Sequence, residues 1–258
     1  LKTETIKKKN LNKFISKLIE KIFIKYFDEI IVVSPSIAEW YKKKYKIKKQ
    51  LVIYNSRKFN PIEKKNYFRE KFKINKKNKI FLYVGNLNKR GRGIDLIINT
   101  FLNEKFKNNV VIFMGKGNAV QSIIEASKKN QNIYYHSPVS TNEINYYTSS
   151  ADIGLCLIEN TCLNENYCLP NKLFEYLSGG IPVIVSNLKE LKNFINQNQC
   201  GYIFNLKNNN LTQFIEKNIT ENLLKIKIAN VHKTNLKFNW ENDEKKIISL
   251  YEKIINPE

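Results

Sequence analysis

The chain has 258 residues, of which 42% are hydrophobic and 12% aromatic, enough for one substantial core and part of a second. This composition excludes an intrinsically disordered chain, and no apolar run reaches the 18 residues of a transmembrane helix. The net charge of +21 is uneven, because residues 1–80 carry 24 of the 44 basic and 7 of the 23 acidic residues. Such a segment suits anionic lipid, phosphorylated substrates or nucleic acid, although lysines on solvated faces give the same totals.

Residues 1–58 have the pattern of the last part of an α/β domain. An apolar helical stripe between residues 11 and 23 precedes a strand (EIIVVS) that we expect to be buried on both faces. A helix opened by Ser36 (SIAEWYKKKY) and a second strand (LVIYN) follow. We interpret the stripe as a core helix covering the strand, with an anionic membrane surface as the alternative. Because so few strands make no stable sheet alone, and because the chain begins with Leu1 and not methionine, we expect a fragment of a longer protein.

From residue 79 onward, short apolar strands alternate with helices of about ten residues, which predicts a parallel sheet covered on both faces. The fold class is therefore α/β, a doubly wound Rossmann-like sheet whose ligand lies at the carboxyl ends of the strands. The expected strands are Ile80–Val84, Val110–Met114, Ile133–His136, Ile153–Leu157, Pro182–Val185 and Tyr202–Phe204. The expected helices are Ile94–Phe101, Ala119–Lys129, Thr141–Ser149, Pro170–Ser178, Leu188–Ile195 and a closing helix within residues 239–258.

The segment LPNKLFEYLSGG places charged residues at the mouth of a core helix. Pro170 suits the first turn, so free backbone amides and the positive end of the helix dipole lie at Cys168–Lys172, as in an anion site. Glu175 shares the face of Lys172 one turn deeper, where its carboxylate can accept hydrogen bonds from two adjacent hydroxyls. These features match a nucleoside diphosphate, and the alternative is an exposed ion pair.

A second candidate is the loop of YVGNLNKRGRGIDLI, which carries Arg92 to the carboxyl edge of the sheet, where phosphates bind. It lacks the Walker pattern, and the motif MGKGN lacks the third glycine of a dinucleotide fingerprint, so we interpret MGKGN as packing. His136 is more typical of a structural histidine than of a ligand. The four cysteines lack a zinc spacing and no aspartate pair suggests a divalent metal, so we expect reduced cysteines and no metal site.

Several segments resemble the retaining GT-B glycosyltransferases of family 4. LPNKLFEYLSGGIPVI and YVGNLNKRGRGIDLI resemble the donor-binding half, and HSPVSTNEINYYTSSADIGLCL is similar to the strand and helix that precede the signature. The resemblance implies a remnant of the N-terminal acceptor-side domain (1–58), a nucleotide-sugar-binding domain (59–238) and a C-terminal helix packing back toward the N-terminal part (239–258).

The resemblance also implies roles for individual residues. Glu175 would bind the donor ribose, while Lys172 and Arg92 hold the diphosphate and stabilise the leaving nucleotide without a metal or other cofactor. The substrate-binding residues would be Gly85, Asn86, Val139 (through its backbone, at the base), Asn164, Glu165, Pro170 and Asn171. Two positions depart from the family. Tyr167 replaces the first glutamate of its paired motif, leaving Glu165 or Asn164 to contact the sugar, and Asn86 replaces a frequent basic residue.

The expected function is transfer of a hexose from a nucleotide diphosphate sugar to a glycan or lipid-linked acceptor, with retention, in surface polysaccharide or lipopolysaccharide synthesis. The expected location is the cytoplasm, peripheral to an anionic membrane surface. One alternative is a nucleotide-sugar epimerase, and another is a donor-binding fragment without transferase activity. A third is a basic nucleic-acid module using aromatics and lysines as in WYKKKYKIKK. No nucleic-acid motif is present, so we expect no nucleic-acid partner.

Overall fold

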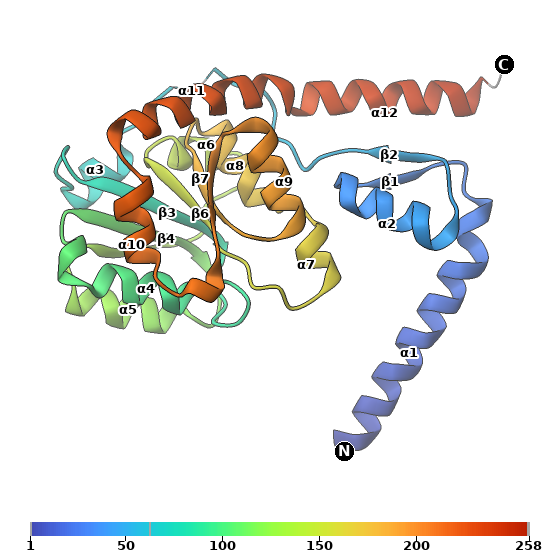
Figure 1. Ribbon diagram of the computed structural model, residues 1–258, viewed down its shortest axis with the longest axis horizontal. Helices are drawn as coiled ribbons and strands as arrows, with labels where there is room; N and C mark the ends of the chain where they lie inside the picture. The colour runs from blue at the N-terminus through green and yellow to red at the C-terminus, as the bar shows by residue number, and fades with distance from the viewer. Residues whose placement is uncertain (1, 62, 257–258) are drawn as a thin grey trace.

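The computed structural model describes residues 2–61 and 63–256, and for residues 2–11 and 13 it describes the backbone alone. A six-stranded parallel sheet forms its centre, in the spatial order β5-β4-β3-β6-β7-β8 (Figure 1). The strands are β3 (Lys79–Asn86), β4 (Asn109–Lys116), β5 (Ile133–His136), β6 (Ile153–Cys156), β7 (Val183–Ser186) and β8 (Gly201–Phe204). Each lies within two residues of the strand predicted from the sequence, which confirms the fold class.

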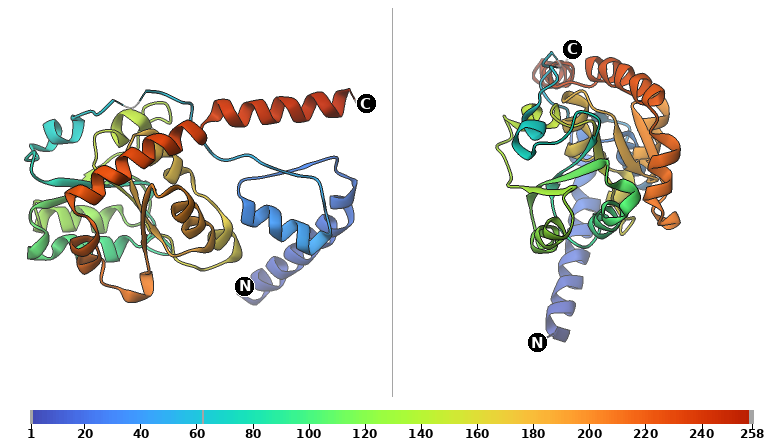
Figure 2. Two further views of the ribbon diagram at one scale, coloured as in Figure 1. Left: turned by 45° about the horizontal axis from the view of Figure 1, so that its top comes forward. Right: turned by 90° about the vertical axis from the view of Figure 1, so that its left-hand side faces the viewer.

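Successive side chains of the central strand β3 enter two separate cores. Ile80, Leu82 and Val84 face one core, and Phe81 and Tyr83 face the other. The first core is closed by α3 (Tyr67–Phe72), α8 (Asn171–Ser178), α9 (Lys189–Asn198) and α11 (Glu221–Lys237). The second is closed by α4 (Ile94–Leu102), α5 (Val120–Lys129) and α10 (Leu211–Asn218), so helices cover both faces of the sheet (Figure 2).

The helices differ from the sequence prediction in several places, and neither α3 nor α10 was predicted. The expected helix at 141–149 is shorter, α6 (Ile144–Thr148), and a further short helix, α7 (Leu163–Tyr167), precedes α8. The 3-10 turns η2 (Glu104–Phe106) and η3 (Leu206–Asn208) complete the connections. Helix α11 was not predicted, because it buries Val231 together with polar Thr234 and Asn235 and so shows no apolar stripe.

The N-terminal segment forms a second, small parallel sheet. Its elements are α1 (Lys2–Phe23), η1 (Ile24–Tyr26), β1 (Ile30–Val32), α2 (Pro35–Tyr45) and β2 (Gln50–Val52). The core-helix interpretation of α1 is wrong, because the stripe from Phe14 to Phe23 is exposed and α1 projects from the molecule (Figure 1). Strand β1 is likewise not buried on both faces, with Ile31 47% exposed. Ser34, not Ser36, caps α2, since its Oγ accepts a hydrogen bond from the Ile37 amide at 3.3 Å.

The last helix, α12 (Trp240–Ile255), continues from α11 and passes over the segment after β2 (Figure 1). The buried carboxylate of Asp243 accepts hydrogen bonds from the Tyr54 amide at 3.2 Å and the Ser56 hydroxyl at 2.8 Å. The Glu241 carboxylate accepts a further one from the Phe59 amide at 2.9 Å. These contacts join the start of α12 to the linker, whereas its later apolar side chains, such as Ile248 and Tyr251, are exposed.

Candidate functional site

The sheet changes winding direction between β3 and β6, and this switch point creates the candidate site. The β3–β6 ladder contains only the pairs Phe81–Ile153 and Leu82–Gly154, after which the two strands separate. The hydroxyl of Tyr176, on α8, fills the gap. It accepts a hydrogen bond from the Val84 amide at 2.9 Å and donates one to the Leu155 carbonyl at 3.1 Å. Helix α8 is thereby fixed against the carboxyl ends of both strands, where ligands of such sheets bind.

Helix α8 begins directly at this switch point. Pro170 occupies the N-cap, one residue before the predicted position, and its carbonyl accepts from the Leu173 amide at 3.0 Å. The amides of Asn171 and Lys172 have no acceptor within the helix. Together with the helix dipole they form a positive surface at the end of β3 and β6, which is suited to an anion.

Lys172 and Glu175 are both buried, with 9% of each residue exposed. Among the described residues neither forms an ion pair, so the alternative of an exposed ion pair between them is excluded. Burial lowers the pKa of Lys172 to about 8, and burial raises the pKa of Glu175. Two groups of opposite charge are therefore held largely out of water without hydrogen-bonding partners from the described residues. This arrangement lowers the stability of the folded protein unless a bound ligand supplies those partners.

Arg92 reaches the same site from the loop between β3 and α4. Gly91 and Gly93 on either side have φ of 77° and 63°, and the Gly91 carbonyl accepts from the Glu159 amide at 3.2 Å. A side chain at position 93 would place its Cβ 2.9 Å from Leu157, so glycine is required there. Arg92 is half-buried, whereas Lys89 and Arg90 are exposed. The proximity of Arg92 contributes to the lowered pKa of Lys172.

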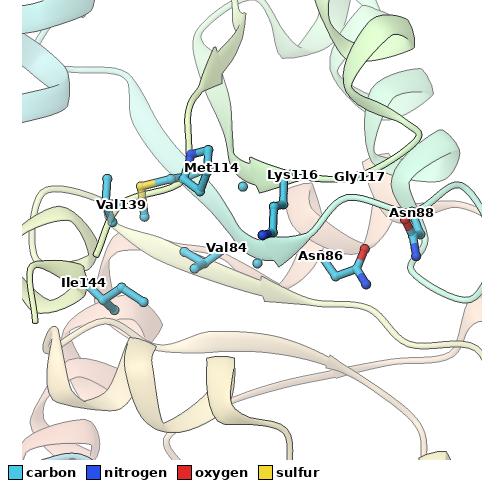
Figure 3. A pocket seen from close by; sticks show the side chains of 11 residues that line it. Val84, Asn86, Asn88, Met114, Lys116, Gly117, Val139 and Ile144 are labelled. Carbon is cyan, nitrogen blue, oxygen red and sulfur yellow. The ribbon is translucent and has the colours of Figure 1, made fainter. Parts of the chain in front are cut away.

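A cavity of 510 Å³ lies beside this group and contains three other predicted residues, Gly85, Asn86 and Val139 (Figure 3). Arg92, Lys172 and Glu175 do not line it, so the predicted site has two adjoining parts. Lys116 also lines the cavity and is the strand neighbour of Asn86 in the β3–β4 ladder. The interpretation of MGKGN as packing is thus incomplete, although Gly115 does pack against the backbone of Gly85. The position of Lys116 at a strand end was the signal that could have identified it.

The two candidates for the missing glutamate, Asn164 and Glu165, both lie on α7. The Glu165 carboxylate accepts hydrogen bonds from the amide and hydroxyl of Thr161, at 2.9 and 2.5 Å. Its other oxygen lies near Gly91. Asn164 lines a separate hollow of 200 Å³ together with Trp40 of α2. The structure therefore brings Glu165 next to the loop that carries Arg92, and it places Asn164 toward the N-terminal segment.

Several other predicted features have structural roles. His136 is buried, with its ring nitrogens 2.6 Å from the Ser137 carbonyl and 3.1 Å from the Tyr67 hydroxyl, which confirms the structural interpretation. The aromatic side chains of α2 are also engaged, since the hydroxyls of Tyr41 and Tyr45 donate to Glu20.

The described part of the chain contains neither a membrane-spanning helix nor a metal cluster. No helix there is long and apolar enough to cross a bilayer. The same residues contain no group of three or more His, Cys, Asp or Glu side chains placed to hold a metal ion.

The fold agrees with comparisons to known proteins. Residues 64–230 match the sequence family described as Glycosyl transferases group 1, and this range covers more than half of the chain. The chain belongs to the group 1 glycosyltransferases. A search of the curated proteins gives no match.

Solved glycosyltransferase structures share the fold at low identity. WaaG, a glycosyltransferase involved in lipopolysaccharide biosynthesis, matches with 17% identity and a TM-score of 0.59 over 80% of this chain and 58% of WaaG. Anabaena HepE, solved with UDP and glucose, matches with 12% identity and a TM-score of 0.71 over 90% of this chain and 65% of HepE. The C-terminal domain of LpcC from Francisella tularensis matches with 16% identity and a TM-score of 0.53, over 70% of this chain and 96% of that domain.

The matched structures show which part of a group 1 glycosyltransferase this chain corresponds to. The six-stranded part has the fold of a GT-B C-terminal domain, the half of the family 4 fold that the sequence resembles. The chain spans less than two thirds of the length of WaaG and of HepE. The switch-point residues Arg92, Lys172 and Glu175 all lie inside the family match.

Proposed function

We propose that this group 1 glycosyltransferase binds a nucleotide diphosphate sugar at the switch point and transfers its sugar. The observation that supports this most directly is the pair of buried charges, Lys172 and Glu175. Among the described residues neither forms a salt bridge, and the Lys172 ammonium has no hydrogen-bond partner. A folded protein retains such a pair at a cost in stability unless a ligand of matching charge pattern completes it. A diphosphate supplies the anion for Lys172, and the ribose diol supplies two donors for Glu175.

The proposed donor position uses both parts of the site. The base enters the cavity between Gly85 and Val139, the ribose binds Glu175, and the diphosphate lies against the amides at the start of α8. Lys172 and Arg92 then face the oxygen that gains charge as the sugar–phosphate bond breaks. Positive groups held in place before the reaction stabilise that charge with little reorganisation, so no metal is required in this mechanism.

The proposed transfer retains the configuration of the sugar, a hexose, and the acceptor is a glycan or a lipid-linked glycan. Surface polysaccharide synthesis is the setting that the sequence resemblance favours. The name of WaaG, involved in lipopolysaccharide biosynthesis, is consistent with that setting. The exposed apolar residues of α1 and the adjacent lysines, among them Lys17 and Lys21, suit a cytoplasmic membrane surface rich in anionic lipid.

Thermal unfolding with a panel of nucleoside diphosphates tests the donor site. A ligand at about 100 times its dissociation constant adds about 2.7 kcal/mol of stability. We expect one nucleotide to stabilise the protein, and Lys172→Met and Glu175→Gln to lose that response. The control Lys128→Met removes an exposed lysine of α5 and should retain it. A folded protein that responds to no nucleotide contradicts the proposal.

The chemistry needs a second assay, because a nucleotide-sugar epimerase would give the same binding result. The matching nucleotide sugar is incubated with the protein with and without a glycan acceptor, and the sugar products are separated. Transfer requires the acceptor, whereas an epimerase converts the donor sugar when no acceptor is present. Conversion without acceptor would replace the transferase proposal with the epimerase.

A further inference from the structure

The side chain of Lys172 contacts an aromatic ring where a hydrogen-bond acceptor would be expected. Its buried ammonium has no hydrogen-bond partner among the described residues. The Nζ atom instead lies 3.7 Å from the ring centroid of Tyr83, a distance at which the negative face of the ring attracts a cation. The ring is fully buried, so this attraction is not weakened by water.

This contact crosses the sheet. Tyr83 belongs to the core closed by α4 and α5, whereas α8 packs on the opposite face with Leu173 and Tyr176. Lys172 can reach the ring because β3 and β6 separate after Leu82. The contact therefore exists only at the switch point, where the candidate site lies.

Tyr83 is held rigidly in this position. It lies on β3 opposite Phe113 in the β3–β4 ladder, and the two rings are 6.1 Å apart. Its hydroxyl donates a hydrogen bond to the carbonyl of Asn86 at 3.3 Å. The side chain of Tyr83 thus connects the ammonium of Lys172 with Asn86, the last residue of β3, which lines the cavity.

None of the titratable groups around Lys172 replaces the ring as a partner. Arg92 approaches from its loop and repels the ammonium, while Glu175 lies on the same helix without a hydrogen bond to it. Cys156 of β6 is fully buried, and burial raises its pKa to about 12, so it is a neutral thiol near pH 7. Burial also raises the pKa of the Tyr83 hydroxyl, which is neutral as well.

We propose that Tyr83 is a positioning residue that keeps Lys172 charged and in place while the site is empty, and yields it to a phosphate group. This inference rests on the proposed donor site. The cation–π attraction is weaker than a charge-assisted hydrogen bond to a phosphate oxygen, so the ammonium transfers from the ring to the bound diphosphate. Without the ring, burial and the charge of Arg92 are opposed less strongly, so Lys172 loses its proton at lower pH.

The test compares Tyr83→Leu, which removes the ring, with Tyr83→Phe, which keeps it. Affinity for the nucleoside diphosphate that stabilises the wild type is measured by calorimetry from pH 6 to pH 9. We expect the wild type and Tyr83→Phe to lose affinity with a midpoint near the Lys172 pKa of about 8. For Tyr83→Leu we expect the midpoint about one pH unit lower. Its affinity should be about tenfold tighter at pH 6, because the ammonium no longer has to leave the ring, and nearly unchanged at pH 9, where Lys172 of the free protein is neutral.

Three outcomes overturn the proposal: an unshifted midpoint for Tyr83→Leu, equal weakening at every pH, or an additional loss when Tyr83→Leu is combined with Lys172→Met. Equal weakening indicates a damaged fold and not a positioning role. Near-ultraviolet circular dichroism of each variant provides the check on folding.

A measurement on the wild-type protein remains informative if Tyr83→Leu does not fold. The ring current of Tyr83 should shift the Lys172 ε-proton resonances upfield in the free protein, and adding the nucleoside diphosphate should restore their ordinary position. Unshifted resonances in the free protein contradict the role of Tyr83. Shifted resonances in a protein that binds no nucleotide would support the contact between Lys172 and Tyr83 but contradict the proposed donor site. The two proposals can therefore fail independently.

Discussion

The ring of Tyr176 lies directly on Gly154, and a Cβ added at that glycine would lie 2.4 Å from the ring. This contact seats α8 on β6 at the point where the sheet changes direction. We expect Gly154→Ala to displace the ring and to lower the free energy of unfolding by about 1–3 kcal/mol, as for other overpacked cores. Urea unfolding measures the change.

A double variant separates overpacking from other effects of the alanine. Tyr176→Ala opens the space above Gly154, so adding Gly154→Ala to it should cost almost nothing further. If the losses in stability of Gly154→Ala and Tyr176→Ala simply add in the double variant, the Tyr176 ring is not the reason why alanine is unfavourable at position 154.

The Tyr176 hydroxyl supplies the hydrogen bonds that β3 and β6 no longer exchange. Tyr176→Phe leaves the Val84 amide and the Leu155 carbonyl unpaired in a buried setting. We expect a loss of about 1–3 kcal/mol in the free energy of unfolding and faster hydrogen exchange at the Val84 amide. Unchanged exchange at Val84 would contradict this role, and amides of β8 serve as the internal reference.

The buried charge of Lys172 makes the stability of the empty protein depend on pH. The pKa of Lys172 is 10.5 in the unfolded chain and about 8 in the folded one. Between pH 8 and pH 10.5, Lys172 is therefore protonated in the unfolded chain and mostly neutral in the folded one. The free energy of unfolding therefore rises as the pH increases from 8 to 10.5. Below pH 8 the folded protein carries the full cost of burying the charged Lys172, about 3 kcal/mol.

Removing this charge should stabilise the protein. We expect Lys172→Met to be about 1–3 kcal/mol more stable than the wild type at pH 7 and nearly equal to it at pH 10. Urea unfolding at both pH values gives the difference, and Lys128→Met should show none at either pH. A difference that does not change with pH would mean that the substitution acts through packing and not through charge.

Asp243 fastens α12 to the linker through Tyr54, Ser56 and Lys246. Asp243→Ala leaves the half-buried Tyr54 amide and Ser56 hydroxyl without their acceptor, at a cost of about 1 kcal/mol per group. We expect faster limited proteolysis within residues 54–61. The neighbouring variant Glu244→Ala removes an exposed carboxylate and should leave the rate unchanged. Equal rates for both variants would show that Asp243 does not hold this contact.

The alternation of apolar strands with helices was enough to predict the six-stranded sheet, because strands buried on both faces have a continuous apolar sequence. The same reasoning placed Arg92, Lys172 and Glu175 near the carboxyl ends of strands, since each follows or begins an element whose direction is fixed by the parallel topology. These predictions depend on local pattern and on chain direction, and both can be read from the sequence.

Other features depend on the tertiary structure, because they join segments that are distant in the chain. The contact of Lys172 with Tyr83 requires β3 and β6 to separate, and no local pattern encodes that separation. The exposed stripe of α1 was misinterpreted because periodicity reveals an apolar face but not the surface that it meets. Spacing along the chain determined which residues share a face of an element. Packing between elements decided which of those faces became a core, a cavity or an exposed surface.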